Sequence, residues 1–177
     1  MAPSPIVKYG NNNLRKPCVE VVFPRTDLKQ IVLSMFLVMY KSRGVGLAAN
    51  QVGLSDKIAV IDIVGDEKAD HQVVLINPVI IESSGEVEIV EGCLSIPGIN
   101  VPVKRPEKIK VETLDLDGNK KIIEADDMLA RAIQHEMDHL SGKLYIDLLH
   151  SVERYLLDGK LKQISREAKR EAKGIIG

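Results

Sequence analysis

The sequence predicts an α+β fold built mainly from antiparallel sheets. Segments rich in Val and Ile follow one another through residues 57–124, with short polar or glycine-containing connections between them. A helical pattern takes over only after the last of these segments, so strands and helices do not alternate. A run of strands of this kind is typical of α+β proteins, whereas alternating units predict a parallel sheet. Asp117 and Gly118 lie between two alternating segments, which is the pattern of a β-hairpin.

Length and composition predict one domain over residues 1–177, with residues 150–177 as a C-terminal helix. The chain is long enough to bury one core, and no linker rich in Pro, Gly or Ser divides it. Its 24 basic and 25 acidic side chains nearly balance, so no specific nucleic-acid partner and no membrane partner is expected. There is no signal-peptide pattern, no apolar segment that could span a bilayer, and only two cysteines. We therefore expect a cytoplasmic protein with free thiols at Cys18 and Cys93.

The individual elements follow from the spacing of apolar residues. Apolar residues three and four apart predict an amphipathic helix over residues 28–40, behind Thr26 or Asp27 as a possible N-cap. Asp126 and Asp127 begin a second helix, acidic in its first turn, that continues to Gly142. The β-branched segments predict strands over residues 57–64, 72–77, 79–81 and 87–90, and hairpin strands over 108–116 and 120–124.

Residues 44–51 (GVGLAANQ) do not resemble the body of a helix or a strand. Two glycines and two alanines lead to a pair of amide side chains, Asn50 and Gln51. The spacing lacks the third glycine and the preceding strand of a dinucleotide-binding motif. Two interpretations stay open: a ligand approaches this backbone closely, or the block is a tight turn packed against the core.

The helix after Asp127 carries Gln134-His135-Glu136-Met137-Asp138-His139. Side chains four residues apart lie on the same face of a helix, so His135 and His139 can bind one metal ion. A metal held by neutral imidazoles makes water acidic, and Glu136 beside the first histidine can take the proton. The pattern therefore predicts metal-assisted hydrolysis, with a third ligand from elsewhere in the chain.

Three sources of that ligand can be compared. A metzincin would have a third histidine six residues after His139, and although Gly142 fits that pattern, the histidine position holds Tyr145. A downstream glutamate is another source, but these belong to a charged, solvent-facing pattern; they are Glu153, Glu167 and Glu171. The remaining candidate is Cys93, where Gly92 lets the backbone turn sharply to present the thiol.

At these residues the sequence resembles the peptide deformylases. The resemblance rests on three segments in the family's order and spacing: 44–51 (GVGLAANQ), 91–95 (EGCLS) and 134–139 (QHEMDH). It covers nearly the whole chain, from residues 14–17 (LRKP) to about residue 147, and weakens in the tail. It implies sheets packed around a central metal-binding helix, in an enzyme that removes the formyl group from the N-formylmethionine of new polypeptides and releases formate.

The resemblance also implies a cofactor. Cys93, His135 and His139 match the family's ligands to one divalent metal, which is Fe(II) in many members, with Zn(II) or Ni(II) as substitutes. A thiolate and two neutral imidazoles leave one unit of positive charge on the ion and a fourth position open for water. Iron beside a thiolate is prone to oxidation, so activity is expected to fall in air.

Roles for further residues follow from the same resemblance. Glu136 takes a proton from the attacking water and returns it to the departing amine. The backbone N–H of Leu94 and the side-chain amide of Gln51 hold the developing oxyanion. An apolar pocket for the methionine side chain is expected from residues of the glycine-rich block, the strand before the cysteine and the helix: Val45, Gly46, Ile89, Met128, Arg131 and Ala132. Backbone at residues 44–47 can pair with the peptide as an added strand.

A helix over residues 152–173 is expected at the end of the chain. Glutamates interleave with its basic side chains, which indicates a solvated face. The bases are Lys160, Lys162, Arg166, Lys169, Arg170 and Lys173. In some bacterial deformylases the C-terminal helix docks on the ribosome, so ribosome contact is a hypothesis here. A zinc endopeptidase and a non-enzymatic RNA-binding module are the two alternative functions.

Overall fold

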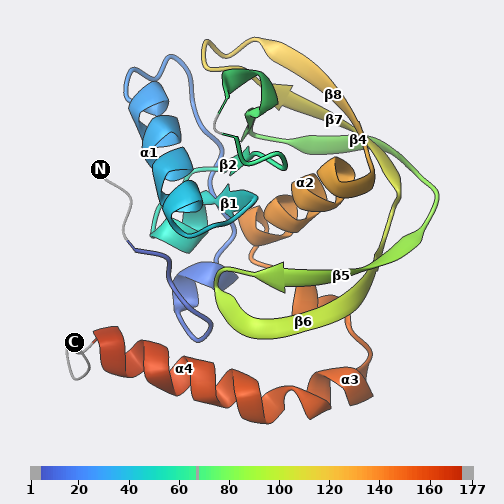
Figure 1. Ribbon diagram of the computed structural model, residues 1–177. Helices are drawn as coiled ribbons and strands as arrows, with labels where there is room; N and C mark the ends of the chain where they lie inside the picture. The colour runs from blue at the N-terminus through green and yellow to red at the C-terminus, as the bar shows by residue number, and fades with distance from the viewer. Residues whose placement is uncertain (1–4, 67, 173–177) are drawn as a thin grey trace.

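Antiparallel sheets surround a buried helix in the computed structural model, which describes residues 5–66 and 68–172 (Figure 1). In the first sheet β2 (Ile58–Ile61) lies between β1 (Gly46–Ala48) and β3 (Val73–Ile76). In the second, β7 (Lys108–Leu114) lies between β4 (Val79–Ser84) and β8 (Lys120–Asp126). The third is a pair, β5 (Val87–Cys93) and β6 (Ile96–Arg105). All of these pairings are antiparallel, so the predicted α+β class is confirmed.

The central helix is α2 (Asp127–Leu140), and Figure 1 shows it in the middle of the molecule between the sheets. Its buried apolar residues, such as Ile133 and Leu140, pack on one face of β2 and on β7 and β8. Asp126 is its N-cap, as the acidic start predicted. Past the end of the helix Gly142 has φ +73°, and a Cβ there would lie 2.6 Å from the backbone oxygen of Arg15. Only glycine combines that conformation with that close approach.

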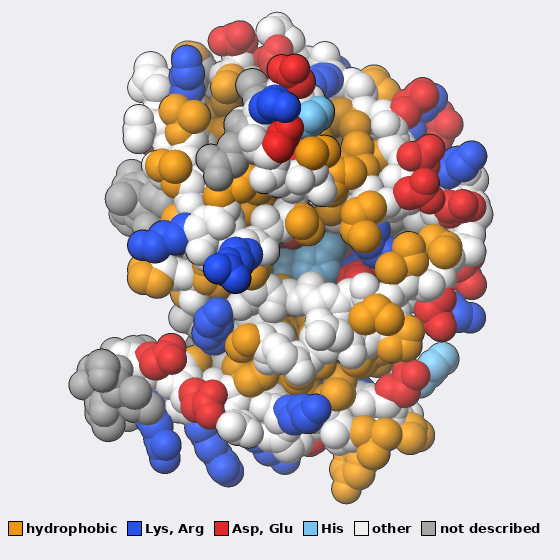
Figure 2. Space-filling model, in the orientation of Figure 1, with side chains coloured by type: hydrophobic (Ala, Val, Ile, Leu, Met, Phe, Trp, Pro, Cys, Tyr) orange, Lys and Arg blue, Asp and Glu red, His pale blue; other side chains and the backbone are white. Residues whose placement is uncertain are grey.

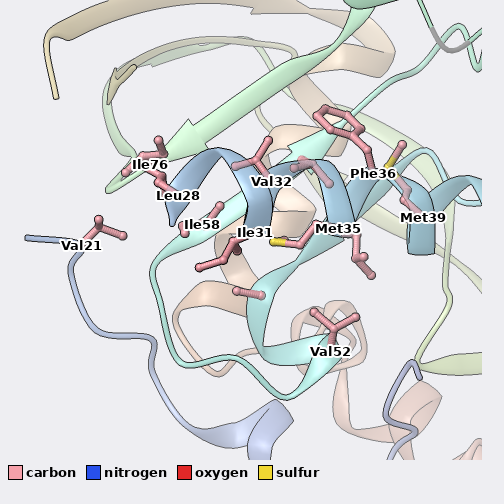
Figure 3. Close-up of a cluster of buried hydrophobic side chains, with 13 residues drawn as sticks. Val21, Leu28, Ile31, Val32, Met35, Phe36, Met39, Val52, Ile58 and Ile76 are labelled. Atoms are coloured by element: carbon pink, nitrogen blue, oxygen red, sulfur yellow. The ribbon is translucent and has the colours of Figure 1, made fainter. Parts of the chain in front are cut away.

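The other face of the first sheet is covered by α1 (Leu28–Lys41), which confirms the helix predicted over residues 28–40. Figure 3 shows the apolar side chains of α1 meeting those of the sheet; Met35 and Met39 are fully buried. Asp27 is the N-cap residue, but its carboxylate binds Arg25 at 2.8 Å and makes no capping hydrogen bond. Because both faces of β2 are covered, all four of its residues are buried.

The six predicted strands are present in the predicted order, but the sequence did not indicate β1, which falls in residues 44–51, or β6. Pro97, Gly98 and Pro102 lie within β6. Proline cannot donate a hydrogen bond to a neighbouring strand and is confined to edge strands, and β6 pairs only with β5 among the described strands. The predicted strand over residues 57–64 is shorter than expected, because β2 ends at Ile61.

Short 3-10 helices connect the larger elements: η1 (Asn12–Arg15), η2 (Ala49–Val52), η3 (Ala69–His71) and η4 (Tyr145–Leu148). The tail forms two helices rather than one, α3 (Ser151–Leu156) and α4 (Asp158–Ala172). Leu161 and Ile164 of α4 are buried in a cluster with β6 and η4. Lys173, which the sequence placed in this helix, lies outside the described residues. No helix in the described part is long and apolar enough to cross a membrane.

Candidate metal centre and active site

Cys93, His135 and His139 come together at the inner face of α2. Their ligand atoms all lie within 4.8 Å of one another, and the Cys93 Sγ is 3.2 Å from the His139 Nε2. Cys93 is the last residue of β5, and the two histidines lie one turn apart on α2, as their spacing predicted. Glu153, Glu167 and Glu171 are exposed and take no part in this cluster. At the metzincin position the Tyr145 hydroxyl donates to the Ile99 carbonyl at 2.7 Å.

The donors of this cluster fit a divalent metal. The Nδ1 of His135 lies 2.9 Å from the Glu91 carboxylate, which leaves its Nε2 free to bind an ion. Burial holds the pKa of His139 well below 6.5, so this imidazole is neutral. Burial opposes protonation of His135 too, but hydrogen bonds to Cys93 and Glu91 raise its pKa to about 10. A metal has to displace that proton, and one thiolate with two imidazoles suits zinc, iron and nickel.

Glu91 is the site residue whose role sequence reasoning missed. It is buried, and its carboxylate accepts hydrogen bonds from Arg105 at 2.6 and 3.0 Å and from Arg131 at 2.7 Å. Burial acts to raise its pKa, but the bonds with His135 and Arg105 lower it to about 2. Glu91 is therefore an anion that fixes the orientation of His135. The only sequence signal was an acidic residue next to the Gly-Cys pair.

Arg131 contributes more than the aliphatic stem expected of it. Besides Glu91, its guanidinium donates to the Val103 carbonyl at 2.7 Å and the Val87 carbonyl at 2.8 Å. These bonds join α2 to β5 and β6, which hold the cysteine. Arg105 links the same elements, because it also binds Asp138 of α2 at 2.7 Å.

Glu136 lies beside the cluster with only 4% of its surface exposed. Its Oε2 has no hydrogen-bond partner in the part of the chain that the structure describes. Burial raises the pKa of this carboxyl to about 7, so near neutral pH it can both accept and release a proton. The other oxygen, Oε1, occupies the space that a side chain on Gly46 would fill.

The block of residues 44–51 is packed against the core, as one of its two interpretations predicted, and part of it also lines a cleft beside the metal cluster. It forms β1 and η2. Gln51 is buried; its Oε1 accepts from the Ala48 N–H at 2.8 Å, and its Nε2 lies 3.2 Å from Ser95 Oγ and 3.6 Å from Cys93 Sγ. Gly44 makes room for Leu94, because a Cβ there would be 2.6 Å from Leu94 Cδ1.

A cleft of about 780 Å³ leads to these residues. Figure 2 shows it as a hollow with histidine at its base and apolar side chains around its rim. Five of the six predicted pocket residues line it: Val45, Gly46, Met128, Arg131 and Ala132. Met128 is 49% exposed and so is not part of the core. Ile89 does not line the cleft, whereas the residues that follow it on β5, Val90 to Cys93, do.

A family model described as polypeptide deformylase matches residues 3–155 of this chain. The chain belongs to the polypeptide deformylase family. Crystal structures of other deformylases agree over nearly its full length. That from Legionella pneumophila is 42% identical, with a TM-score of 0.86, covering 96% of this chain and 99% of its own. That from Plasmodium falciparum is 37% identical, with a TM-score of 0.88, covering 93% and 96%.

A third deformylase structure, from Synechococcus elongatus in complex with actinonin, is 39% identical, with a TM-score of 0.83, covering 90% of this chain and 89% of its own. The resemblance stated from the three sequence segments is thus confirmed. This deformylase is a metal-binding hydrolase, and the cluster of Cys93, His135 and His139 provides a site for a divalent metal.

Proposed function

We propose that this chain removes the formyl group from the N-formylmethionine of newly made polypeptides and releases formate. The observation that carries the proposal is the convergence of a thiol, two imidazoles and a buried carboxyl at the base of one cleft, in a chain of the deformylase family. We assign Cys93, His135 and His139 as the ligands of one divalent metal. When bound, this metal would supply Lewis-acid chemistry and lower the pKa of water, so that water that has given up a proton can attack a carbonyl carbon at neutral pH.

Glu136 carries the proton in this proposal. As water attacks the formyl carbon, the Glu136 carboxylate accepts a proton, and it then gives that proton to the departing amine. Its burial supports the assignment, because a pKa raised to about 7 suits both steps. Its unpartnered Oε2 also supports it, since no other hydrogen bond competes for that oxygen among the described residues.

Gln51 and Leu94 stabilise the developing negative charge on the formyl oxygen. The Gln51 amide nitrogen is 3.6 Å from Cys93 Sγ, so this donor lies beside the proposed metal ligand. The backbone N–H of Leu94 follows Cys93 directly in the chain. Fixed donors aimed at a developing oxyanion typically contribute a hundredfold or more to turnover.

The methionine side chain enters the apolar part of the cleft beside Val45, Met128 and Ala132. The backbone at residues 44–47 pairs with the substrate peptide as an added strand. Main-chain recognition suits an enzyme that accepts many sequences after the methionine.

We infer that Fe(II) is the native metal and the cytoplasm the place of action. A thiolate with two imidazoles accepts iron, zinc or nickel. Because iron beside a thiolate is prone to oxidation, we expect the iron-loaded enzyme to lose activity in air. Neither assignment changes the roles of the side chains above.

The decisive experiment uses the full chain purified without oxygen. One tightly bound divalent metal per chain and release of formate from a formyl-Met peptide are expected, with no cleavage of casein. Metal-loaded, folded protein that releases no formate would refute the proposed function. Casein cleavage without formate release would instead identify an endopeptidase.

We also propose that α4 contacts the ribosome. Its basic side chains Lys160, Lys162, Arg166, Lys169 and Arg170 are exposed, and its apolar residues are turned toward the core. Changing Lys162, Arg166 and Lys169 to Glu should reduce co-sedimentation with ribosomes while formate release from a short peptide stays the same. Unchanged co-sedimentation of this triple variant would remove α4 from the proposal. Deleting the helix is a poorer test, because Leu161 and Ile164 belong to the core.

A further inference from the structure

Residues 7–9, near the start of the described chain, contact both proposed oxyanion donors. The Val7 N–H donates to the Gln51 carbonyl at 2.8 Å, and the Tyr9 N–H donates to the Ser95 carbonyl at 2.8 Å. Between them, the Lys8 ammonium donates to the Leu94 carbonyl, also at 2.8 Å. Gln51 lies in η2 and Leu94 in the turn after β5, and residues 7–9 bridge these two segments.

The contact made by Lys8 differs from the other two because it is made by a charged side chain. Lys8 is half-buried and lines the cleft, and it forms no ion pair within the described chain. A hydrogen bond from an ionised donor is roughly twice as strong as a neutral one. The ammonium is therefore a strong restraint on the Leu94 carbonyl, and it is the one hydrogen-bond donor to that carbonyl among the described residues.

The Leu94 carbonyl and the Leu94 N–H belong to neighbouring peptide groups joined at the Leu94 Cα, so holding the carbonyl restrains the N–H through the backbone dihedrals of Leu94. Leu94 and Ser95 form a turn between β5 and β6, outside the ladder of hydrogen bonds that fixes the strands. Without Lys8, the Leu94 carbonyl has no other hydrogen-bond partner among the contacts of the described residues. The Leu94–Ser95 peptide group is then less restrained within the turn between the paired residues Cys93 and Ile96, and a misplacement of about 1 Å in a catalytic group can cost about a hundredfold in rate.

We propose that Lys8 is a positioning residue for the oxyanion site: its ammonium holds the Leu94 backbone so that the Leu94 N–H faces the formyl oxygen. The proposal rests on the proposed deformylase function and on the role of the Leu94 N–H within it. Lys8 acts through Leu94 and takes no part in proton transfer. The charge is needed for the strength of the bond to a neutral carbonyl, and the length of the side chain is needed to span the two segments.

A competing role for Lys8 follows from its place in the cleft. Arg43 lines the same cleft, so the two cations can attract an acidic residue of the peptide. That role predicts a change in KM that depends on substrate charge. Positioning of the oxyanion donor predicts a change in kcat that is the same for all substrates, because the interaction is made with the transition state.

The test compares Lys8→Met, Lys8→Arg and Lys16→Met, all loaded with the same metal. Lys16→Met is the matched control, because it removes the same charge from an exposed position in the same segment of the chain. Each variant is assayed on two formyl-Met tripeptide amides, one neutral and one with an acidic third residue. Metal content and melting temperature are measured alongside, and amide exchange is followed at Leu94.

In Lys8→Met, kcat is expected to fall about ten- to a hundredfold on both peptides, with KM within about twofold of the wild type. Exchange of the Leu94 amide should become faster, and Lys8→Arg should recover most of kcat. Lys16→Met should match the wild type. An unchanged kcat in Lys8→Met, or a loss confined to KM on the acidic peptide, overturns the proposal while wild-type formate release keeps the proposed function. If Lys8→Met does not fold, the same two measurements are made on Lys8→Arg: the exchange of the Leu94 amide and kcat. A Lys8→Arg variant that loses turnover while its Leu94 amide still exchanges as slowly as in the wild type overturns the proposal.

Discussion

Glu136 keeps its place because Gly46 has no side chain. The carboxylate fills the volume that a Cβ at Gly46 would need, so the glycine of β1 and the glutamate of α2 fit together. Glu136→Gln preserves the shape but cannot accept the proton from water. We expect it to retain the metal while kcat falls by about a hundredfold or more. Metal analysis and a formate assay on the same sample check this, and retained turnover would remove Glu136 from the mechanism.

Glu91 is predicted to matter for metal affinity rather than for the chemical step. Glu91→Gln leaves Arg131 buried without its counter-charge, leaves Arg105 with Asp138 alone, and weakens the bond that orients His135. Losing one partner of a buried ion pair costs about 3–5 kcal/mol, and losing such an orienting contact lowers metal affinity about 10–100-fold. Competition with a chelator measures the affinity. Glu88→Gln, exposed on the same strand, is the control and should change neither quantity.

Site residues that meet because of their spacing along the chain could be predicted from the sequence. His135 and His139 converge because four residues make about one helical turn. The cysteine came from comparing motifs, and the structure places it within reach of both histidines. Glu91 and Lys8 could not be predicted in the same way. Their partners lie 14 to 86 residues away, and nothing in their local sequence indicates which backbone or side chain they meet.

At the scale of elements, α4 combines a core role with an exposed charged face. Leu161 is 1% exposed and packs with residues of β6 and η4. Leu161→Ala should therefore lower the free energy of unfolding by about 2–5 kcal/mol. Leu156→Ala, at a site 75% exposed, should change it by less than about 0.5 kcal/mol. Denaturant unfolding measures both, and equal stabilities would show that α4 is not part of the core.

Helices and strands were predicted correctly where the spacing of apolar residues or a turn motif matched the observed element. The period of α1 places Met35 and Met39 on the sheet, and the Asp-Gly turn places β7 beside β8. The pattern failed for β6, where two prolines and a glycine obscure a strand that pairs along one side only. It also failed to show the break at Leu157, because the apolar spacing continues from α3 into α4.

At the scale of the whole molecule, the site joins segments that no single element holds together. Residues 44–51 and residues 93–95 both lie against the cleft beside α2, and residues 7–9 are hydrogen-bonded to both of these segments. The sequence predicted which segments meet only through resemblance to a family. Pattern alone predicted the class of fold but not the packing, because contacts between distant segments depend on the complete tertiary structure.

A metal that binds this assembled site should stabilise the whole fold. The ligands come from β5 and α2, so an ion restrains two elements that separate on unfolding. Binding at a hundredfold excess over Kd adds about 2.7 kcal/mol, which is about 5–10 °C in melting temperature for a chain of this size. We expect a chelator to remove this increment and Zn(II) to restore it. His139→Ala should melt at the same temperature with and without Zn(II). Equal melting of the loaded and chelated wild type would show that the metal does not couple β5 to α2.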